Sequence, residues 1–320
     1  MLDYLLLILG LALLYKGADY LVEGSSSLAK RLRISSLVIG LTIVAFGTSM
    51  PELIVNVFAS IKGEAAVSFG NIIGSNIFNI LLILGMAAVI VPLTVKKSTA
   101  YKEIPFALLA VAVLFVMSNK SFFFGYPGNV LTLADGIIML IFFIIFLIYI
   151  LGLIRAGKKN HHEEPETKHH PLFKLILMIM GGLVALFLGG EFTVRGAVSI
   201  ARQLGISELL ISSTIVAAGT SLPELVTSVV AAIRKEMDIS VGNIVGSNIF
   251  NIFLIMGVSA VISPLTVPSG INYDFIFLGA ATVGLFAVMF IGTKRKIDRW
   301  EGITFLLMYA AYLAFLIKRG

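Results

Sequence analysis

Hydrophobic residues occur along this chain in long runs, which charged residues, glycine or proline interrupt. A helix of about 20 mostly apolar residues crosses the hydrocarbon core of a bilayer, and the runs are close to that length. The pattern therefore predicts an all-α membrane protein with ten transmembrane helices. The predicted spans are residues 2–24, 35–61, 67–91, 103–119, 130–154, 172–198, 207–233, 239–263, 272–292 and 300–317.

The second half of the chain repeats the first at an offset of 172 residues. GTSMPEL at residues 47–53 returns as GTSLPEL at 219–225, and GNIIGSNIFNI at 70–80 returns as GNIVGSNIFNI at 242–252. The repeat predicts a first five-helix unit over residues 1–154, a linker over 155–171 and a second five-helix unit over 172–320. Because five is an odd number, we expect the second unit to enter the membrane from the opposite side, which makes the repeats inverted.

Composition narrows the class of protein further. The chain is 58% hydrophobic and 13% charged, with a mean hydropathy of +1.01, which excludes an ordinary soluble domain. The absence of cysteine excludes thiolate catalysis, a cysteine-based zinc site and disulfides. No nucleophile elbow or metalloprotease signature is present, so we expect a transporter without a cofactor in preference to an enzyme. The net charge of +6 lies largely in short loops, where it sets membrane topology and indicates no nucleic-acid partner.

The basic residues are divided unequally between the two sides of the predicted membrane. Seventeen of the 24 lysines and arginines fall on the side of the 155–171 linker. The positive-inside rule then predicts a multi-pass protein of the cell membrane with a cytoplasmic linker and both termini outside. The linker also holds all four histidines of the chain. We interpret it as a solvated connection in preference to a transition-metal site.

Each GTS-x-PEL motif places a carboxylate at membrane depth, where a charge is costly and usually functional. The proline of the motif lacks the N–H that would bond the carbonyl four residues back, and glycine occupies that position in both copies. We therefore predict that the second and seventh helices are broken there, and that nearby carbonyls lose their helical partners. The expected oxygen ligands are the carbonyls of Ala45 and Ala217, the hydroxyls of Thr48, Ser49, Thr220 and Ser221, and the carboxylates of Glu52 and Glu224.

The GNI-x-GSNIFNI motif contributes further oxygen atoms. Ser75 and Asn79 are four residues apart and share one helix face, and Ser247 and Asn251 repeat this spacing. Carboxylate, amide, hydroxyl and carbonyl oxygens suit Ca²⁺ and Na⁺ and not Zn²⁺ or Cu²⁺. The two motifs of the two halves thus predict one shared cation site.

Simpler roles exist for several of these residues. Ser and Glu of each GTS-x-PEL motif also fit a capping box, although a neutral Gln would cap at lower desolvation cost. We expect the glycines of the second motif to allow close helix packing. Asp19 and Glu191 are expected to snorkel or to pair with Lys16 or Arg195. The remaining motif asparagines are cation ligands or, by a small preference, hydrogen-bond partners between helices: Asn71, Asn76, Asn243 and Asn248.

The doubled motifs in two halves of five spans resemble the cation/calcium exchanger superfamily, in particular its sodium/calcium exchanger branch. The resemblance implies ten helices in inverted repeats, with the first and sixth helices sliding past an eight-helix core. It implies that Glu52 and Glu224 bind Ca²⁺ and Na⁺ in competition, together with the motif hydroxyls and the two alanine carbonyls. Asn79 and Asn251 replace the Asp found in some relatives, which resembles the potassium-independent pattern with two carboxylates.

The sequence therefore predicts a sodium/calcium antiporter with Ca²⁺, Na⁺ and the lipid bilayer as its partners, working as a monomer. A proton/calcium antiporter is the first alternative, because desolvation favours protonation of buried carboxylates. A cation channel could also use paired carboxylates, although inverted repeats with broken helices argue against it. A membrane hydrolase with Glu52 and Glu224 as an acid and base pair is the remaining alternative.

Overall fold

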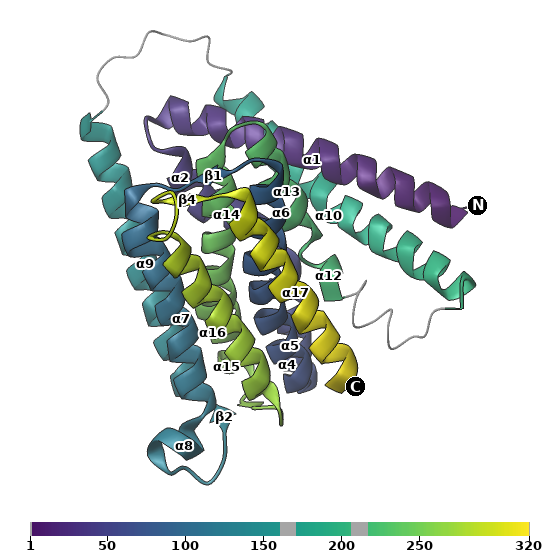
Figure 1. The fold of residues 1–320 in the computed structure, drawn as a ribbon, viewed down its shortest axis with the longest axis vertical. Helices are drawn as coiled ribbons and strands as arrows, with labels where there is room; N and C mark the ends of the chain where they lie inside the picture. The colour runs from purple at the N-terminus through teal and green to yellow at the C-terminus, as the bar shows by residue number, and fades with distance from the viewer. Residues whose placement is uncertain (1, 161–170, 206–216, 320) are drawn as a thin grey trace.

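The structure is a computed structural model that describes residues 2–160, 171–205 and 217–319, and it is almost entirely helical (Figure 1). The histidine-rich part of the linker (161–170) and the beginning of the predicted seventh span lie outside the described residues. Five long helices run without a break: α1 (Leu2–Leu32), α9 (Leu133–Asn160), α10 (Leu172–Gln203), α16 (Ile271–Val288) and α17 (Arg299–Arg319).

Helix α1 continues eight residues beyond the predicted end of the first span at residue 24. The prediction ended the helix at Gly24, but a Cβ atom there would lie 3.1 Å from Ile179 Cγ1 of α10. Gly24 therefore allows two helices to approach and does not terminate one.

The other spans combine α-helical and π-helical segments. The second consists of α2 (Ser36–Ile39), η1 (Gly40–Val44), α3 (Ala45–Thr48) and α4 (Met50–Lys62). The third and fourth consist of α5 (Ala65–Ile77), η2 (Phe78–Leu84), α6 (Gly85–Ile90), η3 (Thr99–Glu103) and α7 (Ile104–Ser118), after which the short α8 covers Lys120–Phe124. The seventh and eighth consist of α12 (Ala217–Gly219), α13 (Leu222–Ile233), α14 (Met237–Ile249), η5 (Phe250–Met256) and α15 (Gly257–Ile262). The π-helical turns were not predicted.

Within the described residues, eight helical spans are long and apolar enough to cross a membrane. The second span adds a ninth if its two parts, which are bent by 47°, count as one. Only α12 and α13 of the predicted seventh span are described, so the tenth span stays a prediction. Exposed isoleucine and leucine side chains along α9 and α10 form the apolar exterior that lipid contact requires.

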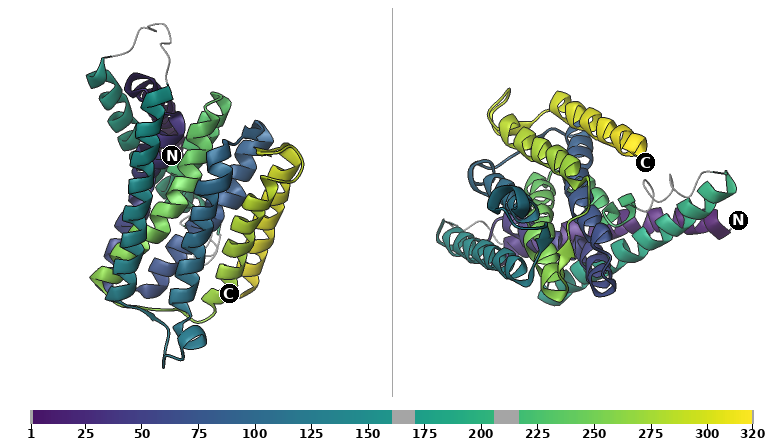
Figure 2. Two further views of the ribbon diagram at one scale, coloured as in Figure 1. Left: turned by 90° about the vertical axis from the view of Figure 1, so that its left-hand side faces the viewer. Right: turned by 90° about the horizontal axis from the view of Figure 1, so that it is seen from below.

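Two spans form the centre of the molecule (Figure 2). In the third (Ala65–Ile90) and the eighth (Met237–Ile262), 78% and 83% of the most apolar stretch is buried, against 22% to 39% in the other six helices. These are the spans that carry the GNI-x-GSNIFNI motifs. The motifs are therefore placed where lipid is excluded and where polar side chains find protein partners.

Two short antiparallel ribbons close the bundle by pairing the halves of the chain. Strand β1 (Leu93–Thr94) pairs with β4 (Lys296–Ile297), and β2 (Val130–Leu131) pairs with β3 (Leu265–Thr266). The N–H groups that extend the ribbons are also equivalent, because Val95 donates to Arg295 and Val267 donates to Asn129. Each half thus supplies a strand to both ribbons.

Paired glycine contacts extend the repeat to the last helix of each half. A Cβ atom on Gly136 of α9 would lie 2.7 Å from the Gly257 carbonyl, and one on Gly302 of α17 would lie 2.7 Å from the Gly85 carbonyl. Gly85 and Gly257 keep the offset of 172 residues, whereas Gly136 and Gly302 are 166 apart. The shorter connection before α17 hides this correspondence in the sequence.

Helices α1 and α10 pack along each other and lie obliquely across the rest of the bundle (Figures 1 and 2). Their contact is made backbone to backbone at glycines. A Cβ atom on Gly17 would lie 2.8 Å from the Gly182 carbonyl, and one on Gly189 would lie 2.7 Å from the Leu14 nitrogen. Small residues at such crossings let two helices approach closely in lipid.

The glycine contact predicts that Gly182→Ala destabilises the protein. The new Cβ atom would lie 2.7 Å from the Gly17 carbonyl and 2.9 Å from the Leu21 nitrogen, so the backbones must separate. Overpacking of this kind costs about 1–3 kcal/mol. Thermal unfolding in detergent checks the change. The control is Gly181→Ala, because a Cβ atom at Gly181 has no described atom within 4 Å. Equal unfolding temperatures for the two variants would contradict the packing argument.

Candidate cation site

Both motif glutamates lie in the first turn of a helix that starts after a break. Glu52 belongs to α4, which follows Ser49 with φ −82° and ψ 6°, and Glu224 belongs to α13, which follows Ser221 with φ −93° and ψ 8°. Both carboxylate residues are 1% exposed. Proline occupies the first turn of both helices, where its missing N–H costs nothing. The predicted breaks in the second and seventh helices are therefore present at the motifs.

The motif serines do not cap their own helices, so the capping interpretation is wrong. Each serine instead binds the carboxylate of the other half. Ser221 Oγ donates to Glu52 Oε1 at 2.8 Å, and Ser49 Oγ donates to Glu224 Oε1 at 3.0 Å. The two carboxylates are thereby held at one place by reciprocal hydrogen bonds between the repeats.

The predicted loss of the helical partner at Ala45 is also wrong. The Ala45 carbonyl accepts a hydrogen bond from the Ser49 N–H at 3.0 Å, as in a regular helix. In the second copy the Ser221 N–H bonds to the carbonyl of Ala218 at 3.2 Å, one residue beyond Ala217. A carbonyl oxygen has two lone pairs, so neither bond removes the carbonyls from the set of expected ligands.

Four asparagines join the central helices by hydrogen bonds. Asn79 Nδ2 donates to Asn248 Oδ1 at 3.0 Å, and Asn251 Nδ2 donates to Asn76 Oδ1 at 2.9 Å. Asn76 and Asn248 therefore connect helices, as preferred for these residues. Asn79 and Asn251 lie in the π-helical segments η2 and η5, which turn both side chains toward the same contact. Such π-helical turns are common at functional sites.

A second ring of polar side chains surrounds the first. Thr48 Oγ1 donates to Asn243 Oδ1 at 3.1 Å, and Asn243 donates to Ser228 Oγ at 3.0 Å. The matching chain in the other half runs from Thr220 Oγ1 to Asn71 at 3.5 Å and from Asn71 to Asn56 at 2.7 Å. Asn56 and Ser228 were not predicted, because the repeat replaces one by the other and neither lies in a repeated motif. Their position one turn after each glutamate was the available signal.

Several buried oxygen atoms of the cluster have no hydrogen-bond partner among the described residues. They belong to both carboxylates, two amides and one hydroxyl: Glu52 Oε2, Glu224 Oε2, Asn79 Oδ1, Asn251 Oδ1 and Ser247 Oγ. Buried polar atoms in proteins are normally paired, and these five are all able to accept. None of the ion pairs found in the described part of the chain includes Glu52 or Glu224. An arrangement with two negative charges and neutral oxygens suits a hard cation.

The two halves of the cluster differ at the motif serines. Ser75 Oγ donates to Glu52 Oε1 at 3.3 Å, whereas the equivalent Ser247 has no partner among the described residues. Ser221 also bonds to Ser75, at 3.1 Å. Glu52 is therefore held by two hydroxyls and Glu224 by one, so the otherwise symmetric cluster is asymmetric in this conformation.

The remaining expectations have mixed outcomes. The close packing predicted for the motif glycines is confirmed at Gly246, where a Cβ atom would lie 2.7 Å from Ala45 Cβ. Glu191 pairs with Arg195 at 2.5 Å, as expected. Asp19 does not pair with Lys16. It forms an ion pair with Arg234, which follows α13 and also contacts Glu23.

Comparison with known proteins places the chain among exchangers. The family model described as "Sodium/calcium exchanger protein" matches residues 2–152 and 174–318. The chain is 36% identical to "Putative antiporter CaxA" of Alkalimonas amylolytica, with 95% of each chain covered. It is 33% identical to "Sodium/calcium exchanger MaX1" of Methanosarcina acetivorans, with 98% of each covered. The solved structure of the sodium-calcium exchanger NCX_Mj with Na⁺ and Ca²⁺ matches with a TM-score of 0.80 at 35% identity, covering 98% of each chain.

The asymmetry of the cluster predicts unequal effects of two equivalent serine substitutions. Ser221→Ala removes hydrogen bonds to Glu52 and Ser75, whereas Ser247→Ala removes none that the described residues make. Loss of a hydrogen bond to a buried charged group costs about 1.5–3 kcal/mol. In detergent with no added Na⁺ or Ca²⁺, we expect a lower unfolding temperature for Ser221→Ala than for Ser247→Ala. The reverse order would contradict the described network.

Proposed function

Since the chain belongs to the sodium/calcium exchanger family, we propose that it is a sodium/calcium antiporter that couples Na⁺ movement to Ca²⁺ movement in the opposite direction. The observation that carries the proposal is the pair of buried carboxylates, each held by a serine of the other half. With no basic partner among the described ion pairs, the two charges match one Ca²⁺ or two Na⁺. The two ions then compete for one site.

The proposed ligands are the carboxylates of Glu52 and Glu224 with neutral oxygens around them. The unpartnered oxygens of Asn79, Asn251 and Ser247 support their assignment. Ser49, Ser221 and Ser75 contact the carboxylates directly, so a bound cation would also be near their hydroxyls. Thr48, Thr220 and the carbonyls of Ala45 and Ala217 complete the proposed set.

We further propose that the fold has ten transmembrane helices in two inverted repeats joined by a cytoplasmic linker. Equivalent hydrogen bonds from Ser49 and Ser221, and equivalent ribbons at β1 and β3, support a two-fold relation between the halves. The proposed setting is the cell membrane, with both termini outside and the monomer as the working unit. In alternating access, a cation shifts the equilibrium between two states only by its difference in affinity for them.

Neutralising either carboxylate tests the site. We expect Glu52→Gln and Glu224→Gln each to reduce Na⁺-driven uptake of radiolabelled Ca²⁺ in proteoliposomes to background, because one remaining charge cannot balance Ca²⁺. Glu191→Gln is the matched control, since Glu191 is exposed and pairs with Arg195 of its own helix. Wild-type uptake by either site variant would remove that glutamate from the site.

Binding measurements separate loss of the site from loss of folding. A cation that binds only the folded protein raises its stability by RT ln(1 + [L]/Kd). We expect Ca²⁺ to raise the unfolding temperature of the wild type and of Glu191→Gln in detergent, and to leave both site variants unchanged. A normal Ca²⁺-induced increase in Glu52→Gln would contradict the assignment even if transport were lost.

The coupling ion is tested by driving uptake with different gradients. Sodium/calcium exchange predicts Ca²⁺ uptake into Na⁺-loaded vesicles and none into Na⁺-free vesicles with an acidic interior. Uptake driven by the pH gradient without Na⁺ would identify a proton/calcium antiporter. Unitary currents in a planar bilayer would identify a channel.

A further inference from the structure

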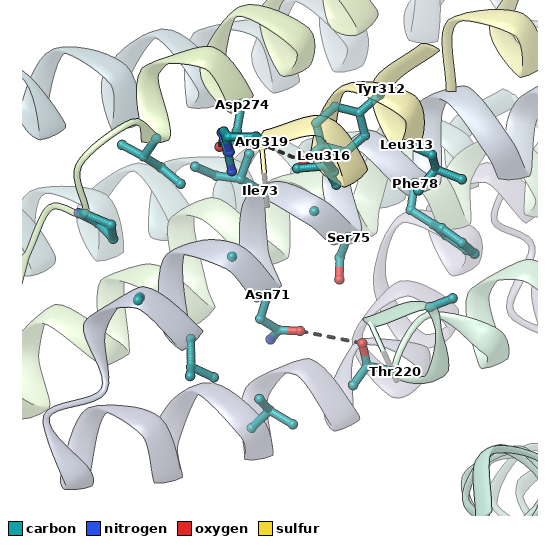
Figure 3. Close-up of a pocket in the computed structure, with 18 of the residues that line it drawn as sticks. Asn71, Ile73, Ser75, Phe78, Thr220, Asp274, Tyr312, Leu313, Leu316 and Arg319 are labelled. Atoms are coloured by element: carbon teal, nitrogen blue, oxygen red, sulfur yellow. Dashed lines mark hydrogen bonds and ion pairs between the residues drawn. The ribbon is translucent and has the colours of Figure 1, made fainter. Parts of the chain in front are cut away.

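A cavity of about 660 Å³ leads from the surface toward the cation site between α5, α16 and α17. Figure 3 shows Asn71, Ser75 and Thr220 on one part of its wall and Asp274, Tyr312 and Arg319 on another. Ser75 Oγ donates to Glu52 Oε1 at 3.3 Å, so the cavity reaches within one hydrogen bond of that carboxylate. The Arg319 side chain is 39% exposed, which places the other end at the protein surface.

One ion pair determines the charge of this cavity. Asp274 and Arg319 are the only charged side chains among the described residues that line it. Arg319 Nη1 lies 2.8 Å from Asp274 Oδ2, and the Tyr312 hydroxyl donates to Asp274 Oδ1 at 2.9 Å. The Asp274 side chain is 2% exposed. The carboxylate on the cavity wall is therefore neutralised by an arginine at the surface.

The surroundings make this neutralisation important for a passing cation. The rest of the wall is largely apolar, with Phe78, Tyr309 and Leu316 among its residues. Low-dielectric walls focus the field of a charge along a cavity, and the local concentration of a counter-ion rises with that field. A divalent ion responds to a given potential twice as strongly as a monovalent ion. The balance of Asp274 and Arg319 thus acts more on Ca²⁺ than on Na⁺.

We propose that the Asp274–Arg319 ion pair sets the electrostatic potential of the cation entry route, and that Arg319 limits Ca²⁺ capture by neutralising Asp274. This rests on the proposed exchange activity and on the cavity being the route to Glu52. The pair has no counterpart of the same charge in the first half, where Lys102 stands at the position equivalent to Asp274. The entry routes on the two sides of the membrane are therefore expected to attract Ca²⁺ unequally.

The test measures the external Ca²⁺ concentration for half-maximal Na⁺-driven uptake at low and high ionic strength. At low ionic strength, we expect Arg319→Gln to lower this concentration by about three- to tenfold, because Asp274 then attracts Ca²⁺ unopposed. The shift should shrink at about 0.3 M inert salt, where the Debye length is well under about 10 Å. The maximal rate should change by less than about twofold, since the altered step is capture.

The matched control is Lys318→Gln, which removes a positive charge from the neighbouring exposed residue outside the cavity lining. A shift of less than about twofold is expected for it, because solvent screens an exposed charge that does not face the cavity. Equal shifts in Lys318→Gln and Arg319→Gln, or no shift in Arg319→Gln, would overturn the proposal. Wild-type protein without Na⁺-dependent uptake would instead contradict the proposed function.

Two more variants distinguish an electrostatic role from a structural tie between α16 and α17. Asp274→Asn should raise the half-maximal Ca²⁺ concentration, and combining it with Arg319→Gln should return it toward the wild-type value. A structural tie predicts loss of stability in both single variants and no opposite shifts. If Asp274→Asn does not fold, the comparison of Arg319→Gln with Lys318→Gln still decides the question.

Discussion

The need to hold two carboxylates in the centre of a membrane protein without a basic partner determines much of this structure. A buried charge is destabilising unless hydrogen bonds or an ion of opposite charge compensate it. Here the serine hydroxyls satisfy one oxygen of each carboxylate and leave the other free. The asparagines of η2 and η5 use their amide N–H groups on each other and leave their carbonyl oxygens free. The arrangement keeps the site rich in acceptors, which is what distinguishes a cation site from a polar packing contact.

The fold supplies this arrangement by treating its helices differently. The two central spans are mostly buried and carry the asparagines, whereas α1 and α10 form a separate pair across the bundle. Glycine contacts between α1 and α10 leave few interlocking side chains along their length. The link from α1 to the rest is partly ionic, since Asp19 and Glu23 both contact Arg234. Ionic contacts of this kind are easier to exchange than packed apolar ones, which suits a pair of helices that changes position.

Sequence reasoning recovered the parts of this molecule that the repeat makes visible. The duplicated Gly, Pro and Glu located the breaks at Ser49 and Ser221, and the shared helix face brought Ser75 near Glu52. It missed features that depend on residues distant in sequence. Arg234 is 215 positions from Asp19, and no local spacing connects them. The π-helical turns were missed because their residues have the same apolar pattern as an α-helix. Asn56 was missed because the second half has Ser at that position.

The reciprocal serine bonds have a consequence for biosynthesis. The first half of a chain is made and inserted before the second. At that stage Glu52 is in the membrane, but the Ser221 hydroxyl that binds it has not been synthesised. The amide partner of Asn79 is also missing, because Asn248 belongs to the second half. Neither half contains a complete site, so the nascent first half must carry an unsatisfied acidic group until its counterpart arrives, and the ion-binding centre is among the last parts of the protein to form.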